Sequence, residues 1–391
     1  MTDQVVRDPA KPPRTAPGPD QADVIVRNAK VTTLQDDRPE AQAFAVRSEK
    51  IVAVGDDPEI VRLRGDRTRV IDAEGRRVIP GLNDSHLHAI RGALFYNLEL
   101  RWDGVRSLQR GLQMIREQAK RTPKGGWVRV IGGWSPFQFD EQRWPTGVEL
   151  NDAAPDTPVF VLFAYSQVML NKAGAAALKL TPDSKPVEGG TYECVDGGGL
   201  VVQGTAAVYA TIAQLPTLPD AGDQLNSTRY FFKELNRFGM TSTVDAGATG
   251  VDYPRDYKAV GTMAAWPKFP IRIASFLFAQ KRGTEIESFK QWTAMNERGV
   301  NHADSRLNGF VLEGGGEILV WDASDFENFM APRLELKPQV DDELREVTEL
   351  LSRNHWPIRI HATYDETITG ATTRGSDELP TRLDALRIYT P

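Results

Sequence analysis

Two histidines one residue apart, His86 and His88, are the residues whose types and spacing point most directly to chemistry. They follow the dipeptide Pro80-Gly81, where a short apolar run gives way to polar residues, as at the end of a strand. In a strand, a period of two points both imidazoles to the same side. Converging imidazoles are the start of a divalent metal site, so we predict that this pair binds a metal. The alternative is a pair of surface or core histidines in a strand-to-loop turn.

Such a site needs a rigid scaffold, and the composition is compatible with one. The 391 residues are 40% apolar and 26% charged, which is ordinary for a soluble globular protein. This length accommodates one large α/β domain and a small one. The net charge of −6 argues against a nucleic-acid or anionic-membrane surface, so we expect neither kind of partner.

The compartment is predicted from cysteine content and apolar runs. Cys194 is the only cysteine, which excludes an intrachain disulfide and fits a reducing compartment. No apolar stretch approaches the roughly 20 residues of a membrane span. Residues 1–21 are polar and proline-rich, without the apolar segment of a secretory signal. We therefore expect a disordered leader at 1–21 and a cytoplasmic protein.

The elements that must position the histidines follow from the apolar periodicity. Short β-segments occupy residues 22–79 and include a hairpin around residues 48–50. Beyond the histidine pair, apolar spacing and β-rich runs alternate. The expected helices are 108–119, 226–238 and 341–353, and the expected strands are 240–247, 269–276, 307–314 and 356–362. This β/α alternation, with polar side chains at the strand ends, is typical of a (β/α)8 barrel.

The stretch from Pro80 to His88, with Asp84 before the histidines, resembles the first-strand signature of the amidohydrolase superfamily of metal-dependent hydrolases. Residues 127–134, 150–161 and 171–178 are similar to the insertion domain of its YtcJ-like branch, amidohydrolase family 3. Where that branch commonly has Asp-Gly-His, residues 165–167 of this chain read Tyr-Ser-Gln. A substrate-side histidine is therefore missing, and specificity is not carried over.

The resemblance implies the fold and the domain organisation. Residues 80–368 are expected to form a TIM-like (β/α)8 barrel with a β-rich insertion at about 125–215. Residues 22–79 resemble the N-terminal half of the small β-sandwich that flanks such barrels. In the family this sandwich is completed by strands that return from the C-terminus.

The resemblance also implies further site residues. His361 ends the predicted fifth strand and resembles the metal histidine that the family has there; the alternative is a strand-end histidine satisfied by backbone groups. Glu313, at the end of the predicted fourth strand, stands where the family often has a bridging lysine or acid. A turn carboxylate before the glycine run 314–316 is the favoured alternative for Glu313. Asp84 is expected to orient a ligating histidine.

The activity that the resemblance implies is hydrolysis of amide-type, non-peptide C–N bonds in a small molecule. A metal, expected to be zinc with iron as the alternative, activates a water and stabilises the oxyanion. In the family a strand-eight aspartate moves the proton, and a further metal histidine comes from strand six.

Neither of these two family residues has a counterpart after His361. Only 30 residues follow it, without a histidine, which is too short for three strands and their crossovers. Residues 369–391 form an atypical tail, so we hypothesise a C-terminally truncated chain with impaired activity. The alternative function is a catalytically inactive remnant or a metal-binding regulatory protein. An open barrel would expose edge strands, which predicts low stability and self-association into a homo-oligomer.

The remaining candidates favour structural interpretations. Cys194, in a glycine-rich stretch, is interpreted as a buried or idle thiol rather than a nucleophile. His302 and His355 are interpreted as a loop and a helix-end residue. Core packing is favoured over a pocket lining for five aromatic residues of the insertion, Trp127, Trp134, Phe137, Phe139 and Trp144.

Overall fold

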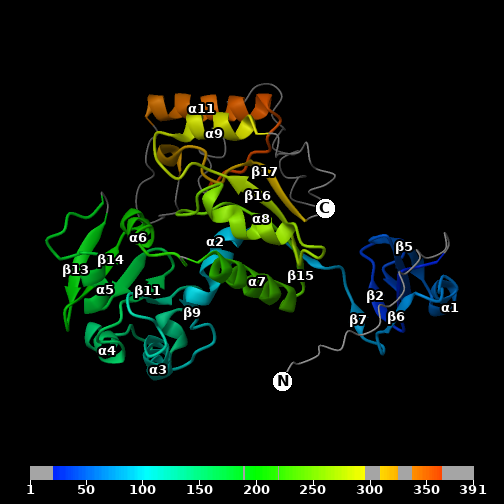
Figure 1. Ribbon diagram of the computed structural model, residues 1–391, viewed down its shortest axis with the longest axis horizontal. Helices are drawn as coiled ribbons and strands as arrows, with labels where there is room; N and C mark the ends of the chain where they lie inside the picture. Colours follow the sequence, from blue (N-terminus) through cyan, green and yellow to red (C-terminus); the bar gives the residue numbers. More distant parts are fainter. Residues whose placement is uncertain (1–20, 188–189, 219, 296–308, 325–336, 363–391) are drawn as a thin grey trace, which may run out of the picture. The chain divides into compact units, whose positions relative to one another are not determined.

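A computed structural model describes residues 21–187, 190–218, 220–295, 309–324 and 337–362. The chain divides into two compact units, Met1–Leu82 and Asn83–Pro391 (Figure 1). Residues 1–20 of the predicted leader, the predicted tail 369–391 and His302 lie outside the described residues.

The first unit contains two small sheets. One has the order β5-β4-β1-β6 and the other the order β3-β2-β7. The elements are β1 (Val24–Arg27), β2 (Lys30–Thr32), β3 (Glu40–Ala41), β4 (Ala43–Arg47), β5 (Lys50–Gly55), α1 (Asp57–Val61), β6 (Arg69–Asp72) and β7 (Arg77–Val78). The predicted hairpin is confirmed, because β4 and β5 pair antiparallel around Ser48 and Glu49, whose φ angles are 47° and 66°. Two positive φ angles in a two-residue loop match the right-handed twist of the flanking strands.

The second unit is built around a four-stranded sheet with the order β17-β16-β15-β8. Its strands are β8 (Leu82–Leu87), β15 (Met240–Asp245), β16 (Arg272–Leu277) and β17 (Phe310–Gly315). Strand β16 runs parallel to both β15 and β17. The strands predicted at 240–247, 269–276 and 307–314 are therefore confirmed, with ends shifted by a few residues.

Helices of the second unit pack on this sheet and on one another (Figure 1). They are α2 (Ala89–Phe95), α7 (Ala221–Arg237), α8 (Lys258–Ala264), α9 (Glu285–Thr293) and α11 (Pro338–Arg353), with short 3-10 turns η1 (Tyr96–Leu98), η3 (Arg255–Tyr257) and η4 (Trp321–Ala323). Their apolar faces form one core with the strands, in which Phe232 of α7, Phe289 of α9 and Val347 of α11 are fully buried.

The segment predicted as a fifth strand, 356–362, lies beside β17 but pairs with it through a single parallel bridge between Gly315 and Ile358. Gly315 donates to the Pro357 carbonyl at 3.0 Å and accepts from the Arg359 amide at 2.9 Å. A Cβ atom at Gly314 or Gly316 would collide with backbone of this segment. The glycine run therefore permits the close approach of two backbones.

A second sheet of this unit has the order β13-β14-β12-β11-β10-β9, and all of its strands except β9 lie within residues 125–215 of the predicted insertion. Its strands are β9 (Glu99–Leu100), β10 (Val128–Val130), β11 (Val159–Phe163), β12 (Gln167–Leu170), β13 (Thr191–Val195) and β14 (Gly199–Gln203). The accompanying helices are α3 (Leu108–Ala119), η2 (Pro136–Gln138), α4 (Gly147–Ala153), α5 (Lys172–Ala177) and α6 (Thr205–Ile212).

The aromatic residues of the insertion pack mainly into its core. Trp134 lies edge-on to Trp144 with ring centroids 5.4 Å apart, and it also contacts Phe139. Trp127 is buried in a separate cluster. The core interpretation is confirmed for these four residues and is wrong for Phe137, which is 80% exposed. Cys194 on β13 is exposed, so the buried alternative for this thiol is wrong, and the alternative of an idle thiol stays a prediction.

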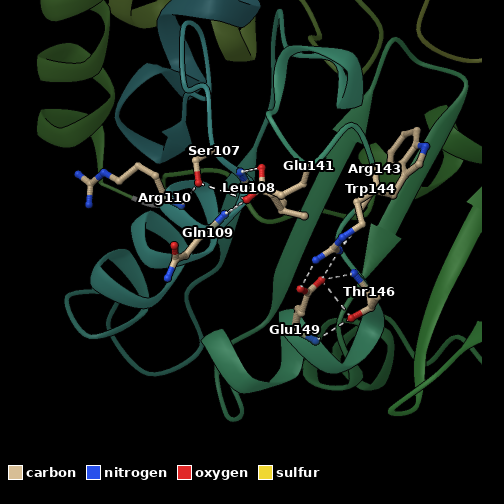
Figure 2. A network of polar contacts seen from close by, with 9 residues as sticks. All are labelled: Ser107, Leu108, Gln109, Arg110, Glu141, Arg143, Trp144, Thr146 and Glu149. Carbon is tan, nitrogen blue, oxygen red and sulfur yellow. Dashed lines mark hydrogen bonds and ion pairs between the residues drawn. The ribbon is translucent and has the colours of Figure 1, made fainter.

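Charged side chains cap helices α3 and α4 (Figure 2). Glu141 accepts hydrogen bonds from the amides of Leu108 and Gln109, at 2.9 and 3.2 Å, in the first turn of α3. At α4, Thr146 and Glu149 form a reciprocal capping box, and Arg143 places two nitrogens 2.9 and 2.7 Å from the Glu149 carboxylate. Amides that the helices leave unpaired are thereby satisfied.

None of the helices in the described ranges is both long and apolar enough to cross a membrane.

The capping box yields a pH-dependent prediction. The hydrogen bonds from Arg143 and then from Thr146, which outweigh partial burial, lower the pKa of Glu149 from 4.5 to about 2. A group whose pKa is lowered by folding contributes its stability above about pH 4.5 and loses it as the pH falls toward 2. Glu149→Gln should therefore reduce the free energy of unfolding by about 1 kcal/mol at pH 7 and by less at pH 3.

Urea unfolding at the two pH values measures this difference. The control is Glu193→Gln, which removes an exposed carboxylate from the same unit and should change stability little at either pH. An equal loss for Glu149→Gln at pH 7 and pH 3 would contradict the assigned role of the charged carboxylate.

Candidate metal centre

The structure brings His86 and His88 together at the end of β8. His86 lies within the strand, and His88 is the N-cap residue of α2. Their ring centroids are 5.4 Å apart with an interplanar angle of 82°. The Nε2 atoms of both rings approach one carboxylate, that of Glu317, at 3.4 Å from His86 to Oε2 and 3.7 Å from His88 to Oε1.

Glu317 follows the glycine run at the end of β17 and is only 9% exposed. Its backbone amide donates to the Ala246 carbonyl at 3.1 Å, just beyond β15. Its own carbonyl accepts from the His361 amide at 3.0 Å. The backbone of Glu317 is therefore held between the end of β15 and the segment that carries His361.

His361 supplies a third imidazole to the same carboxylate. Its Nδ1 lies 3.5 Å from Glu317 Oε2. The three histidines reach Glu317 from β8, from the N-cap of α2 and from the segment beside β17. Segments that are far apart in the sequence thus meet at one edge of the parallel sheet, where the strands end.

Hydrogen bonding and burial leave imidazole nitrogens available as ligands. His88 Nδ1 hydrogen-bonds the Gly247 carbonyl, and because a carbonyl accepts only, the proton is on Nδ1 and Nε2 carries a lone pair. Burial, opposed by the charge of Glu317, lowers the pKa of His86 below its ordinary value. His86 is therefore neutral at pH 7, as a metal ligand must be.

The carboxylate is held in its charged form. Burial raises the pKa of Glu317, but His361, His88 and His86 together outweigh burial, and the net pKa lies below the ordinary value. Its Oε2 atom is buried and accepts no hydrogen bond from the described part of the chain. A buried charge without a full complement of partners is costly, and a cation at this position would compensate it.

Asp245, at the end of β15, is a buried carboxylate that contacts the first turn of the helix after His88. It accepts a hydrogen bond from the Ile90 amide at 3.2 Å and another from the Ser275 hydroxyl at 2.7 Å. Burial raises the pKa of Asp245. Because Ile90 lies in the first turn of α2, this carboxylate positions the helix that begins at His88.

The donor set fits a divalent metal. Ligand atoms of His86, His88 and Glu317 lie within 4.8 Å of one another, so a single ion can contact all three. Two imidazoles and a carboxylate are typical ligands of zinc and of iron(II) in enzymes that keep a coordination position open. The buried Oε2 atom of Glu317, which has no hydrogen-bond partner among the described residues, supplies negative charge that such an ion would balance.

The predicted acidic residue and the observed one differ. Glu313 lies within β17, four residues before Glu317, and is not part of this cluster of described residues. Its ligand role therefore stays a prediction. Glu317 was missed, although it is the first acidic residue after the glycine run, because the strand was expected to end at residue 314. Asp84 accepts from the His86 backbone amide at 2.9 Å and so braces the backbone of the ligand rather than its ring.

Comparison with known proteins identifies relatives of this chain. Residues 69–384 match the amidohydrolase family. The chain is 30% identical over 167 residues to the protein LONG AFTER FAR-RED 3 of Arabidopsis thaliana, covering 42% of this chain and 28% of that protein. It is 31% identical over 159 residues to the N-substituted formamide deformylase of Arthrobacter pascens, covering 40% and 29%. The chain thus spans less than a third of the length of these relatives.

A solved structure shares the fold. A metal-dependent hydrolase from Pyrococcus horikoshii OT3 superposes with a TM-score of 0.58 at 18% sequence identity, covering 90% of this chain and 67% of that one. At this identity the likeness concerns the fold alone. The family match extends over most of the sequence and includes the three histidines and Glu317, and this chain therefore belongs to the amidohydrolase family.

Proposed function

We propose that this protein is a metal-dependent hydrolase that cleaves a non-peptide C–N bond in a small amide-type molecule. The observation that carries the proposal is the convergence of His86, His88 and His361 on the buried carboxylate of Glu317. The family membership and the similarity to a relative named as an N-substituted formamide deformylase support the reaction class.

The proposed ligands are His86, His88 and Glu317, with His361 as a further ligand and zinc as the expected metal. A bound divalent metal supplies Lewis-acid chemistry: it lowers the pKa of a water and polarises a carbonyl. The protein contributes the fixed geometry of its own groups. The Gly247 carbonyl holds the proton on His88 Nδ1, and Asp245 fixes the helix that begins at His88.

The scaffold that supports this proposal is a TIM-like barrel of the YtcJ-like branch. The order β8, β15, β16, β17 and then the bridge at Ile358 follows the chain, as consecutive barrel strands would. The candidate ligands lie at the ends of the strands, where barrel enzymes place their active sites. We interpret the two sheets of residues 22–79 as part of the accompanying β-sandwich.

Metal content tests the ligand assignment. Purified wild-type protein should hold about one divalent ion per chain after dialysis, and His86→Ala and Glu317→Gln should lose most of it, because each removes a ligand. Glu313→Gln is the matched control, since it changes a carboxylate four residues earlier, on β17 and outside the cluster, and it should keep its metal. Elemental analysis would contradict the assignment if Glu313→Gln lost the metal while Glu317→Gln retained it.

Turnover tests the reaction class. The metal-loaded protein should release formate from an N-substituted formamide or a carboxylate from a simple amide, and chelation should abolish this activity. Glu317→Gln should lower kcat/KM by more than about 100-fold. Loss of a residue that only orients a metal ligand already lowers activity by about 10- to 100-fold, and loss of the ligand itself should lower it further. Metal-loaded protein that hydrolyses neither class of substrate would contradict the proposed reaction.

A further inference from the structure

A cavity of about 590 Å³ lies in the second unit, lined by α2, β10, the chain after α6 and the loop after β15. This volume is within the range of small-molecule sites. Four cationic side chains line it, together with one carboxylate, that of Asp256. The four cations are Arg91, Arg129, Arg255 and Lys258. We call this space the arginine cavity.

Arg129 is the unusual member of the lining. The residue is only 2% exposed, yet its Nε atom has no hydrogen-bond partner among the described residues. One terminal nitrogen donates to the Pro216 carbonyl, and the guanidinium lies 5.7 Å from the ring centroid of Phe95. Burial, which outweighs the charge of Glu99, lowers the pKa of Arg129 to about 10, so the side chain remains charged at pH 7. A buried, charged donor with an unused N–H is suited to an anionic acceptor.

Two carboxylates, those of Asp256 and Glu99, lie close to these cations. The Oε1 atom of Glu99 is buried without a hydrogen-bond partner among the described residues, and its charge acts on Arg91 and Arg129. Arg255 places Nη2 2.7 Å and Nε 3.0 Å from the two oxygens of Asp256, which balances the only acid of the lining. Glu99 is the register partner of Arg129 on β9 and forms an ion pair with Arg101 at 3.0 Å. The cavity therefore keeps an excess of positive charge.

The other cations add to this excess. Arg91 lies on α2 with its guanidinium 5.8 Å from the ring centroid of Phe95, and Lys258 opens α8 at an exposed position. The buried carboxylate of Glu99 interacts electrostatically with Arg91 and balances its charge in part. Apolar side chains of Phe95, Ile131 and Ile212 complete the lining. The cavity thus suits a ligand with one anionic group and an apolar body.

The arginine cavity adjoins the candidate metal centre. Helix α2 begins directly after His88, so Arg91 follows that histidine by three residues, or about 4.5 Å of helix axis. Thr249 and Gly250 of the lining follow Gly247, whose carbonyl hydrogen-bonds His88. The cavity and the candidate metal ligands are therefore held by neighbouring residues of the same two segments.

We propose that the arginine cavity binds the carboxylate of the substrate, so that the preferred substrates are amides or formamides with an acidic group away from the scissile bond. This specificity rests on the proposed hydrolase function. The recognition itself, of a carboxylate by Arg129 with Arg91 and Lys258, does not require turnover and can be measured by binding.

The test compares phenylacetate with phenylethanol, a neutral analogue of the same shape, by isothermal titration calorimetry on the full, metal-loaded chain. Phenylacetate should bind about tenfold more tightly than phenylethanol. The reason is that a hydrogen bond to a charged group contributes about 1.4 kcal/mol more binding free energy than a neutral one, which corresponds to about tenfold in affinity. The preference should fall as the salt concentration rises. Equal binding of the two compounds, or no binding of phenylacetate, would overturn the proposal.

Variants locate the binding site. Arg129→Gln should abolish the preference for phenylacetate over phenylethanol. Arg91→Gln and Lys258→Gln should each weaken the binding of phenylacetate severalfold. Because these two variants change less buried positions, they keep the test valid if Arg129→Gln does not fold. Lys120→Gln removes a positive charge from the exposed end of α3 and is the matched control, with unchanged binding expected. If Lys120→Gln weakened binding as much as Arg91→Gln, the effect would be one of net charge, and the proposal would be wrong.

Two further measurements separate this proposal from the proposed function. His86→Ala should still bind phenylacetate, and loss of binding in that variant alone would place the carboxylate on the metal and overturn the cavity assignment. If the hydrolase proposal fails, no amide is turned over but the binding preference remains. If it holds, N-formyl amino acids should have a higher kcat/KM than the matching N-formyl amines, and Arg91→Gln should reduce this ratio.

Discussion

The burial of the Glu317 carboxylate is the constraint on which the rest of the site depends. A carboxylate that is 9% exposed must be compensated by partners, and its partners here are three imidazoles that are too distant for ordinary hydrogen bonds. The glycine run before it lets the backbone pass close to the segment 357–359. Two backbone hydrogen bonds, to Ala246 and from His361, then fix Glu317 at the point where these segments meet.

The local part of this arrangement was predictable from the sequence. His86 and His88 were expected together from strand parity, although His88 lies just beyond β8 as the N-cap of α2. His361 was expected beside them because it ends a β-rich run and resembles the metal histidine of the family. The parallel strands and the hairpin at Ser48 also followed from short-range patterns. The strands, the hairpin and the histidine pair depend on residues a few positions apart, which a sequence records directly.

The remainder depends on contacts between distant segments. The sequence alone could not identify Glu317 rather than Glu313 as the acidic residue of the site. Backbone hydrogen bonds with Ala246 and His361, 71 and 44 residues away, place Glu317 there. The segment at 356–362 was expected to be a full strand but makes one bridge, since its partner β17 ends in glycines. Asp245 had no distinguishing signal, because its role lies in its contacts with Ile90 and Ser275. The arginine cavity likewise combines residues of β10, α2 and the loop after β15.

X-ray absorption spectroscopy of the zinc-loaded protein would show whether the three histidines and Glu317 form a single metal centre. The spectrum should show several imidazole ligands at about 2.0–2.1 Å. The imidazole signal should fall in His361→Ala, and the nearest ligand shell should change in Glu317→Gln. A shell of oxygen ligands without imidazole, or spectra that neither variant alters, would contradict a metal centre formed by these four residues.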